Sequence, residues 1–236
     1  MAVAILQARM SSSRLPGKVL MPLAGRPMIS RQIERLARCK RLTRLIVATS
    51  DLPSDDPLAS HLTSQGVDVF RGSLEDVLAR YLDCAHQFGV TGDIVRLTAD
   101  CPLIDPGVVD EAIELRASSG VDYVANGRNR TYPRGLDVEV FPLEALEEAG
   151  RHAVDAYDHE HVTPYLYHHP EAFTRRDLVH VTRNDSHLRW TVDTAEDYAF
   201  AARVYDALYP GKPDFTSEDI RALPFSHYEP EYLEAK

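Results

Sequence analysis

Short apolar runs rich in β-branched residues alternate with longer amphipathic segments along the first half of this chain. The pattern predicts strands over 3–6, 45–49, 67–70, 93–97 and 122–126 and helices over 28–39, 57–65, 75–88 and 106–118. Such alternation is typical of a mostly parallel sheet with helices on both faces. Because 236 residues with 44% apolar content suffice for one core, we expect a single three-layer α/β/α domain over residues 1–236.

The second half of the chain has a less regular pattern. It predicts strands over 136–141, 173–181 and 188–192 and helices over 155–168 and 194–208, with Thr194 as the N-cap of the last helix. We expect the region of about 130–185 to form a small excursion that contains β-structure and packs over the functional site or against a second subunit. The polar tail over 225–236 is expected to be an arm or a frayed end.

An excess of acidic residues narrows the possible functions. The 36 acidic and 26 basic side chains give a formal net charge of −10, which disfavours binding to nucleic acid or to an anionic membrane. Any anionic ligand must therefore be held by a local cluster of cations. The three cysteines show neither CxxC spacing nor histidine-rich partners, so we expect no disulfide or zinc framework and a reducing cytoplasm as the location. We expect neither an export signal nor a membrane span, because no run approaches ~18 apolar residues.

The stretch QARMSSSRLPGKVL, residues 7–20, concentrates positive charge directly after the first expected strand. Arginine offers bidentate forks to phosphate oxygens and lysine a compact charge, so Arg9, Arg14 and Lys18 on a tight loop suit a polyphosphate. Pro16 and Gly17 supply the chain reversal. The stretch is no Walker loop, since GxxxxGK[ST] is absent. Taken alone, it is explained equally well as a solvated surface turn.

Two aspartates are expected at the same rim of the sheet. Asp100 follows a strand in RLTADCPLID, and Asp193 follows an expected strand in RWTVDTAEDY. Ligands of parallel sheets bind beyond the carboxyl ends of the strands, which also places the loops after residues 6, 70 and 97 on one rim. Carboxylates near a cationic loop suit Mg²⁺, with phosphate oxygens completing its coordination. Taken singly, each aspartate is equally well explained as a helix cap.

These separated motifs together resemble a known family. They are similar to the signature of the nucleotidyltransferases that activate sugars as CMP derivatives, the 3-deoxy-manno-octulosonate and acylneuraminate cytidylyltransferases, and above all to the branch named after the spore coat polysaccharide biosynthesis protein SpsF. The resemblance extends from about residue 2 to about residue 205. It implies a Rossmann-like, GT-A-like nucleotidyltransferase fold, CTP as a substrate, and a homodimer.

The resemblance also assigns roles to residues of the rim. Arg9, Arg14 and Lys18 match positions that hold the nucleoside triphosphate, and Asp100 and Asp193 match paired Mg²⁺ ligands. Arg14, Lys18 and Asp100 are therefore the expected catalytic residues.

The rest of the nucleotide pocket is expected near Ala8 and in RGSLEDVLARY, residues 71–81. In that segment the resemblance points first to Ser73 and Asp76, and then to Arg71 and Arg80. Capping of the following helix explains Ser73 equally well.

Charged residues in the second half are candidates for the acceptor side. YPRGLDVEVF, residues 132–141, carries Arg134, Asp137 and Glu139, and the two acids share one face of the expected strand. They could grip sugar hydroxyls or an acceptor carboxylate, or they could be outward-facing charges on an edge strand. DHEHVTPYLYHH, residues 158–169, adds Glu160 and His161, and the SpsF-like branch has a similar EHVTPY run. A solvated or dimer-facing helix is the default interpretation of this segment.

We therefore expect a Mg²⁺-dependent cytidylyltransferase that transfers CMP from CTP to a hydroxyl of a sugar or sugar acid and releases pyrophosphate, in the synthesis of activated sugars for surface polysaccharides. The chain has TADCPLI where the octulosonate enzymes carry QGDEPLI and lacks their SGTDR motif, so their particular acid sugar is not carried over. Two alternatives stay open. One is a nucleotide-sugar-dependent glycosyltransferase, although its usual DxD signature is missing, and the other is a non-catalytic nucleotide-binding subunit.

Overall fold

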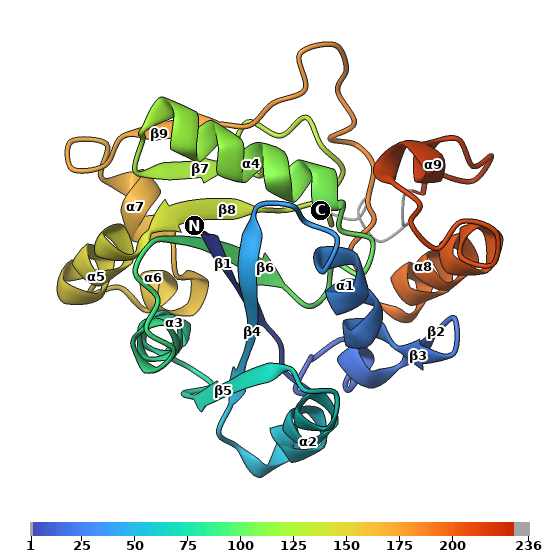
Figure 1. The fold of residues 1–236 in the computed structure, drawn as a ribbon, viewed down its shortest axis with the longest axis horizontal. Helices are drawn as coiled ribbons and strands as arrows, with labels where there is room; N and C mark the ends of the chain where they lie inside the picture. The colour runs from blue at the N-terminus through green and yellow to red at the C-terminus, as the bar shows by residue number, and fades with distance from the viewer. Residues whose placement is uncertain (1, 229–236) are drawn as a thin grey trace.

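A seven-stranded sheet forms the centre of the molecule in the computed structural model, which describes residues 2–228 (Figure 1). Its strands, in the spatial order β5-β4-β1-β6-β8-β7-β9, are β5 (Asp68–Gly72), β4 (Leu42–Ser50), β1 (Ala2–Gln7), β6 (Asp93–Thr98), β8 (Glu139–Pro142), β7 (Tyr123–Ala125) and β9 (Arg175–Asp177). All neighbours pair in parallel except β8, which is antiparallel to both β6 and β7. The mostly parallel sheet predicted from the sequence is confirmed.

Helices cover both faces of the sheet, as the three-layer prediction requires. Side chains alternate along a strand, so Ala4 and Leu6 of β1 join one buried cluster and Ile5 joins the other. The first cluster is completed by α1 (Met28–Leu36), α2 (Asp56–Ser64), α4 (Pro106–Ser119), α8 (Ala195–Leu208) and α9 (Ser217–Arg221). The second is completed by α3 (Val77–Gln87), α5 (Leu143–His152) and α7 (Pro164–His168), and α6 (Ala156–His161) packs against α3.

Shorter elements lie at the rim. The 3-10 turns η1 (Lys18–Leu20) and η2 (Pro53–Asp55) follow β1 and β4, and β2 (Pro22–Leu23) and β3 (Arg26–Pro27) form a separate hairpin. The carboxyl ends of β1, β5 and β6 lie on one edge, as the sequence predicts, because these strands run in the same direction.

The second half departs from the sequence prediction in one strand. The expected strand over 188–192 is wrong, since this segment forms an isolated bridge between Arg134 and Arg189. Its backbone groups bind two different loops: Trp190 N donates to the Arg134 carbonyl at 2.6 Å, and Val192 N donates to the Asp100 carbonyl at 2.7 Å. Backbone groups must be paired when buried, and here loops supply the partners that a strand would have supplied.

Other boundaries differ in the same half. The expected helix over 155–168 is broken between α6 and α7 at Val162, which has a φ of 72°, and α7 starts at Pro164, whose ring cannot continue a helix hydrogen-bond ladder. The strand expected over 173–181 is reduced to β9, and β7, β8 and β9 extend the central sheet. Helices α5 and α9 were not predicted. Thr194 caps α8 as predicted, in a capping box with Asp197.

The tail was expected over 225–236, and its part beyond position 228 lies outside the described residues. Of the helices formed by residues 2–228, none is both long enough and apolar enough to cross a membrane.

Candidate active site

The loop that follows β1 is held by its own backbone and by a buried carboxylate. The Met10 carbonyl accepts hydrogen bonds from the amides of Ser12 and Gly17 at 3.0 and 2.8 Å. Gly17 has a φ of 74°, a conformation that favours glycine. Asp55 is fully buried and accepts a hydrogen bond from the Met10 amide at 2.6 Å. The loop therefore reaches the rim with a defined shape, immediately before Lys18.

Lys18 lies between the two aspartates of the rim. Its Nζ donates to the Val192 carbonyl at 2.7 Å and to Asp193 Oδ1 at 3.1 Å, and it lies 3.9 Å from Asp100 Oδ2. The segment that carries Asp193 is fastened to Asp100 itself, because Val192 N and Thr191 Oγ1 both donate to the Asp100 carbonyl, at 2.7 and 3.1 Å. Backbone pairing thus brings two carboxylates that are distant in sequence to one ammonium group.

The two aspartates have different surroundings. Asp193 contacts Lys18, Arg14 (3.2 Å) and Arg189 (2.6 Å). Burial opposes its ionisation, but these cations outweigh burial and hold the pKa of the Asp193 carboxyl below its ordinary value. Asp100 accepts a hydrogen bond from Thr98 Oγ1 at 2.5 Å, and its side chain is 31% exposed. Asp193 is therefore a paired anion, whereas Asp100 faces open space.

A cavity of about 710 Å³, which we call the loop cavity, opens beside the loop after β1. Arg9, Arg14 and Lys18 line it, together with Asp100, Asp193, the start of α3 and helix α6. Three cations on one wall favour a polyanionic ligand.

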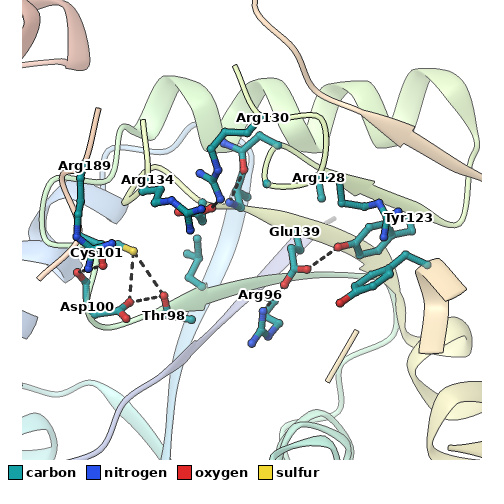
Figure 2. Close-up of a pocket in the computed structure, with 18 of the residues that line it drawn as sticks. Arg96, Thr98, Asp100, Cys101, Tyr123, Arg128, Arg130, Arg134, Glu139 and Arg189 are labelled. Carbon is teal, nitrogen blue, oxygen red and sulfur yellow. Dashed lines mark hydrogen bonds and ion pairs between the residues drawn. The ribbon is translucent and has the colours of Figure 1, made fainter. Parts of the chain in front are cut away.

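A second cavity of about 570 Å³, which we call the arginine cavity, lies on the other side of Asp100. Figure 2 shows Arg128, Arg130 and Arg134 on one side of the cavity and Arg96, beside Glu139, on the other. Arg189 lies near Asp100. The two cavities meet, since Thr98, Asp100 and Asp193 line both.

The acids of the arginine cavity are engaged with neighbouring groups. Asp137 accepts hydrogen bonds from Arg130 at 2.5 Å and from the Gly135 amide at 2.8 Å. Glu139 accepts from Tyr123 at 2.5 Å and from Thr163 at 2.8 Å, and its other oxygen pairs with Arg96. These carboxylates therefore hold the walls of the cavity in place.

Two arginines of this cavity are exposed. Arg134 and Arg128 are both exposed, and the guanidinium carbon of Arg128 lies 4.4 Å from the centre of the Tyr167 ring. The cavity thus presents cations to its interior, while Asp137 and Glu139 face other protein groups.

The sequence-predicted nucleotide residues separate into two groups. Ala8, Arg9, Arg14, Lys18 and Asp76 line the loop cavity. The other two predicted residues, Arg71 and Ser73, do not line this cavity.

Arg71 lines neither cavity of the described chain. It donates to the carbonyls of Ser50 and Leu52 at 3.1 and 2.9 Å and pairs with Asp56 at 2.7 Å. Ser73 likewise lines neither, and its Oγ accepts a hydrogen bond from the Asp76 amide at 3.0 Å. Ser73 is not the cap of α3, because Asp76 is the N-cap; Ser73 instead holds the turn that precedes this helix.

The predicted acceptor residues also divide. Arg134, Asp137 and Glu139 line the arginine cavity, whereas Glu160 and His161, on α6, line the loop cavity. The reason is the break at Val162, which leaves α6 against α3 on the nucleotide side.

Several residues of the arginine cavity were missed from the sequence. Arg96 and Arg189 are charges inside apolar runs, DIVRLT and LRWTV, and a charge at such a position is a usable signal because burying it requires a partner. Arg128 and Arg130 belong to the loop GRNRTYPRG, where only folding reveals which arginines converge. Arg80, which the resemblance also suggested, lines the loop cavity instead; it is buried and donates to the Ser73 carbonyl, so it shapes the loop before α3.

The two aspartates are the candidates for holding a divalent cation. Within residues 2–228, no group of three or more His, Cys, Asp and Glu side chains is placed to hold a metal ion. Asp100 and Asp193 nevertheless present carboxylate oxygens on either side of Lys18. Mg²⁺ prefers such hard oxygen ligands and is commonly held by one or two carboxylates together with water and phosphate oxygens. The residues present therefore fit Mg²⁺ shared with a bound polyphosphate.

Known proteins are similar to this chain in sequence. The cytidylyltransferase family model matches residues 3–212. The spore coat polysaccharide biosynthesis protein SpsF of Bacillus subtilis (strain 168) is 34% identical over 227 residues, which are 93% of this chain and 92% of SpsF. The uncharacterized protein MJ1063 of Methanocaldococcus jannaschii is 38% identical over 200 residues, which are 83% of this chain and 79% of that protein.

A solved structure agrees with these relatives. The structure of a cytidylyltransferase from Leptospira borgpetersenii serovar Hardjo-bovis (strain JB197) has a TM-score of 0.87 and 34% identity, over 92% of this chain and 91% of that one. The family match takes in the loop after β1, both aspartates and both cavities. This chain therefore belongs to the cytidylyltransferase family and is a CTP-dependent nucleotidyltransferase.

Proposed function

We propose that this protein transfers CMP from CTP to a hydroxyl group of a sugar or sugar acid and releases pyrophosphate. The observation that carries the proposal is the meeting of the two cavities at Thr98, Asp100 and Asp193. Transfer of a phosphoryl-type group needs the attacking and leaving oxygens roughly in line. Two cavities that share one wall of carboxylates supply separate places for a nucleotide and an acceptor on either side of the reacting phosphorus.

In this proposal the loop cavity takes CTP. Arg9 and Arg14 hold oxygens of the triphosphate, and the resemblance of the opening motif supports this role. Lys18 lies at the junction of the cavities, so it acts on the α-phosphate, where charge develops during transfer. Stabilisation by such a preorganised charge is usually a large part of catalysis.

The arginine cavity takes the acceptor. The exposed Arg128 and Arg134 favour an acceptor with an acidic group, since arginine pairs with carboxylates through two parallel hydrogen bonds. The name of the SpsF relative refers to spore coat polysaccharide biosynthesis. We infer by similarity that the product is an activated sugar for a surface polysaccharide.

Mg²⁺ would be held by Asp100 and Asp193 together with triphosphate oxygens. When bound, it would supply positive charge that neutralises the triphosphate and favours departure of pyrophosphate. Of the chain's own groups, Lys18 keeps the two carboxylates in position, and Thr98 orients Asp100 by donating to Oδ1.

We also propose that the protein is a cytoplasmic homodimer. The family resemblance supports the dimer, with the region of about 130–185 as the dimerisation and acceptor-site region within one nucleotidyltransferase domain over 1–236. The three unpaired cysteines support a reducing location.

Pyrophosphate release tests the proposal. The protein is mixed with CTP, Mg²⁺ and a panel of sugars and sugar acids, pyrophosphate is followed by a coupled assay, and the CMP-linked product is identified by mass spectrometry. Acceptor-dependent pyrophosphate release that prefers CTP over ATP and GTP supports the proposal. Comparable turnover of all three nucleotides, or release of a free nucleotide from a nucleotide sugar in place of pyrophosphate, would contradict it.

A further inference from the structure

His159 lies on α6 where this helix meets the start of α3, at the wall of the loop cavity. Its Nδ1 lies 2.9 Å from Asp76 Oδ2, and its Nε2 lies 3.2 Å from the Ala153 carbonyl. Nδ1 is shielded from solvent, and the contact with Asp76 is an ion pair rather than a linear hydrogen bond. The ring therefore joins two helices that form opposite parts of one wall.

The two partners of the ring define its protonation state. A backbone carbonyl and a carboxylate can only accept protons in hydrogen bonds. A lone pair on either ring nitrogen would face an electron-rich oxygen, so the doubly protonated imidazolium is the form that fits both partners. The contact with Asp76 raises the pKa of His159 above its ordinary value, although partial burial opposes this.

Asp76 is itself fixed, because its other oxygen caps α3 by accepting from the Ala79 amide at 2.8 Å. The charged and titratable groups near the imidazolium are Asp76 at the N-cap of α3, Arg80 on α3, and Asp158, Glu160 and His161 on α6, and Arg9 and Glu75 line the same cavity. The charge of His159 is thus added to a cavity wall that already holds cations for an anionic ligand.

We propose that His159 is a positioning residue of the nucleotide site, which as an imidazolium holds α6 against the cap of α3 and keeps the wall of the loop cavity closed around CTP. This inference rests on the proposed binding of CTP in that cavity. It gives α6 a role in nucleotide binding, in addition to the roles proposed for the opening motif and for the two aspartates.

The proposal predicts a pH dependence with a definite sign. A histidine with a raised pKa contributes fully below its ordinary pKa and loses its contribution as pH rises through the raised value. The affinity for CTP gained through His159 is therefore present at mildly acidic pH and lost at alkaline pH. CTP also ionises over this range, so the informative quantity is the ratio of dissociation constants between variant and wild type.

His159→Gln tests this ratio, because glutamine can donate one hydrogen bond but cannot become charged. By calorimetry with CTP, we expect the variant to bind roughly ten-fold more weakly than wild type near pH 6, the scale of a charge-assisted contact, and the ratio to fall towards one near pH 9. Circular dichroism checks that the variant is folded. A ratio that does not change with pH would overturn the inference alone, and a wild type that binds no CTP would overturn the proposed function with it.

His152→Gln is the matched control. His152 pairs with Glu148 on the outer face of α5, at 3.2 Å, and lies outside both cavities. Its replacement should leave the dissociation constant for CTP unchanged at every pH. A pH-dependent ratio of similar size in this variant would show that any histidine–carboxylate pair in the region gives the effect, and would contradict a specific role for His159.

Titration of the ring by NMR gives a second, direct readout. If the imidazolium form binds CTP more tightly, linkage requires that CTP raise the proton affinity of His159 by the same factor, which is seen as a higher pKa. Asp76→Asn keeps a cap for α3 but removes the charge, so it should lower the pKa of His159. An unchanged pKa of His159 on addition of CTP would overturn the proposal.

Discussion

The loop cavity and the arginine cavity are built in different ways. Arg9, Arg14 and Lys18 of the first come from the loop after β1 and the first residue of η1, and Arg9 and Arg14 remain exposed. The arginines of the second come from β6, from the loop after β7 and from the irregular segment before α8, and Arg96, Arg130 and Arg189 are each paired with a carboxylate. In the first cavity, exposed arginines are therefore available to a ligand. In the second, most of the arginines are paired with carboxylates of the protein.

This difference predicts different responses to mutation. Removing a loop cation should weaken one ligand contact and leave the fold intact. Removing an acid of the arginine cavity should release an arginine and disturb the wall, because a buried charge without its partner is costly. Residues at the junction of the cavities should affect both substrates.

The largest effect is expected at the junction, for Asp100→Asn. The change keeps the shape of the side chain but removes a charge that the proposed divalent cation would require. Activity should fall by about 10³-fold or more, on the scale of losing a major electrostatic stabiliser. Pyrophosphate release under saturating CTP and acceptor measures the loss.

The double variant sharpens this test. If Asp100 and Asp193 serve one ion, replacing both should cost little more than replacing either. Asp110→Asn, whose carboxylate accepts from the Lys40 and Arg41 amides outside both cavities, serves as the control and should keep wild-type activity. Fully additive losses would count against a shared ion.

Lys18→Ala should have the next largest effect. Lys18 lies within 3.9 Å of both aspartates, where charge changes during transfer. An interaction that strengthens in the transition state lowers kcat when it is removed. We expect kcat to fall by ~10²-fold with a smaller change in KM for CTP. A variant with normal kcat and a raised KM would place Lys18 in ground-state binding instead.

The loop cavity could be predicted from the sequence more fully than the arginine cavity. Arg9, Arg14 and Lys18 lie within one motif after a recognisable strand, so local pattern and parallel topology place them at the rim. Asp193 was expected at the end of a strand. It reaches the rim through the hydrogen bonds that the Val192 amide and the Thr191 hydroxyl donate to the Asp100 carbonyl, which no local pattern contains.

The arginine cavity depends on contacts between distant segments. Gly135 has a φ of 102°, and a Cβ there would lie 2.5 Å from Thr191 N, so only glycine lets the two irregular segments pack closely. Sequence alternation identifies regular strands and helices, but it carries no information on which loop packs on which. The pairing of Glu139 with Arg96 depends on the antiparallel register of β6 and β8, which was also not predictable.

Glu139→Gln tests the architectural role of an acid in the arginine cavity. Glutamine has the same shape but no charge to hold Arg96, so the acceptor side should be disturbed. We expect KM for the acceptor to rise about ten-fold and KM for CTP to stay near the wild-type value, with a loss of stability of about 1–3 kcal/mol. Steady-state kinetics and urea unfolding measure both. Glu148→Gln, on the outer face of α5, is the control and should change neither. A rise in KM for CTP alone would reverse the assignment of the cavities.

The smallest effect is expected for Arg9→Ala, and it separates the two kinds of charge most cleanly. Arg9 is exposed and lines the loop cavity, so in the proposed complex it would contact charge that CTP carries before reaction. Uniform binding of this kind appears in KM and leaves kcat unchanged. We expect KM for CTP to rise about three- to ten-fold.

Because exposed charges are screened by salt, the ratio between the KM values of variant and wild type should shrink as salt is raised from about 0.05 to 0.5 M. The effect of Glu139→Gln, which acts through a half-buried pair, should depend much less on salt. Equal salt dependence for the two variants would show that the cavities use charge in the same way, and the contrast between them would then be wrong.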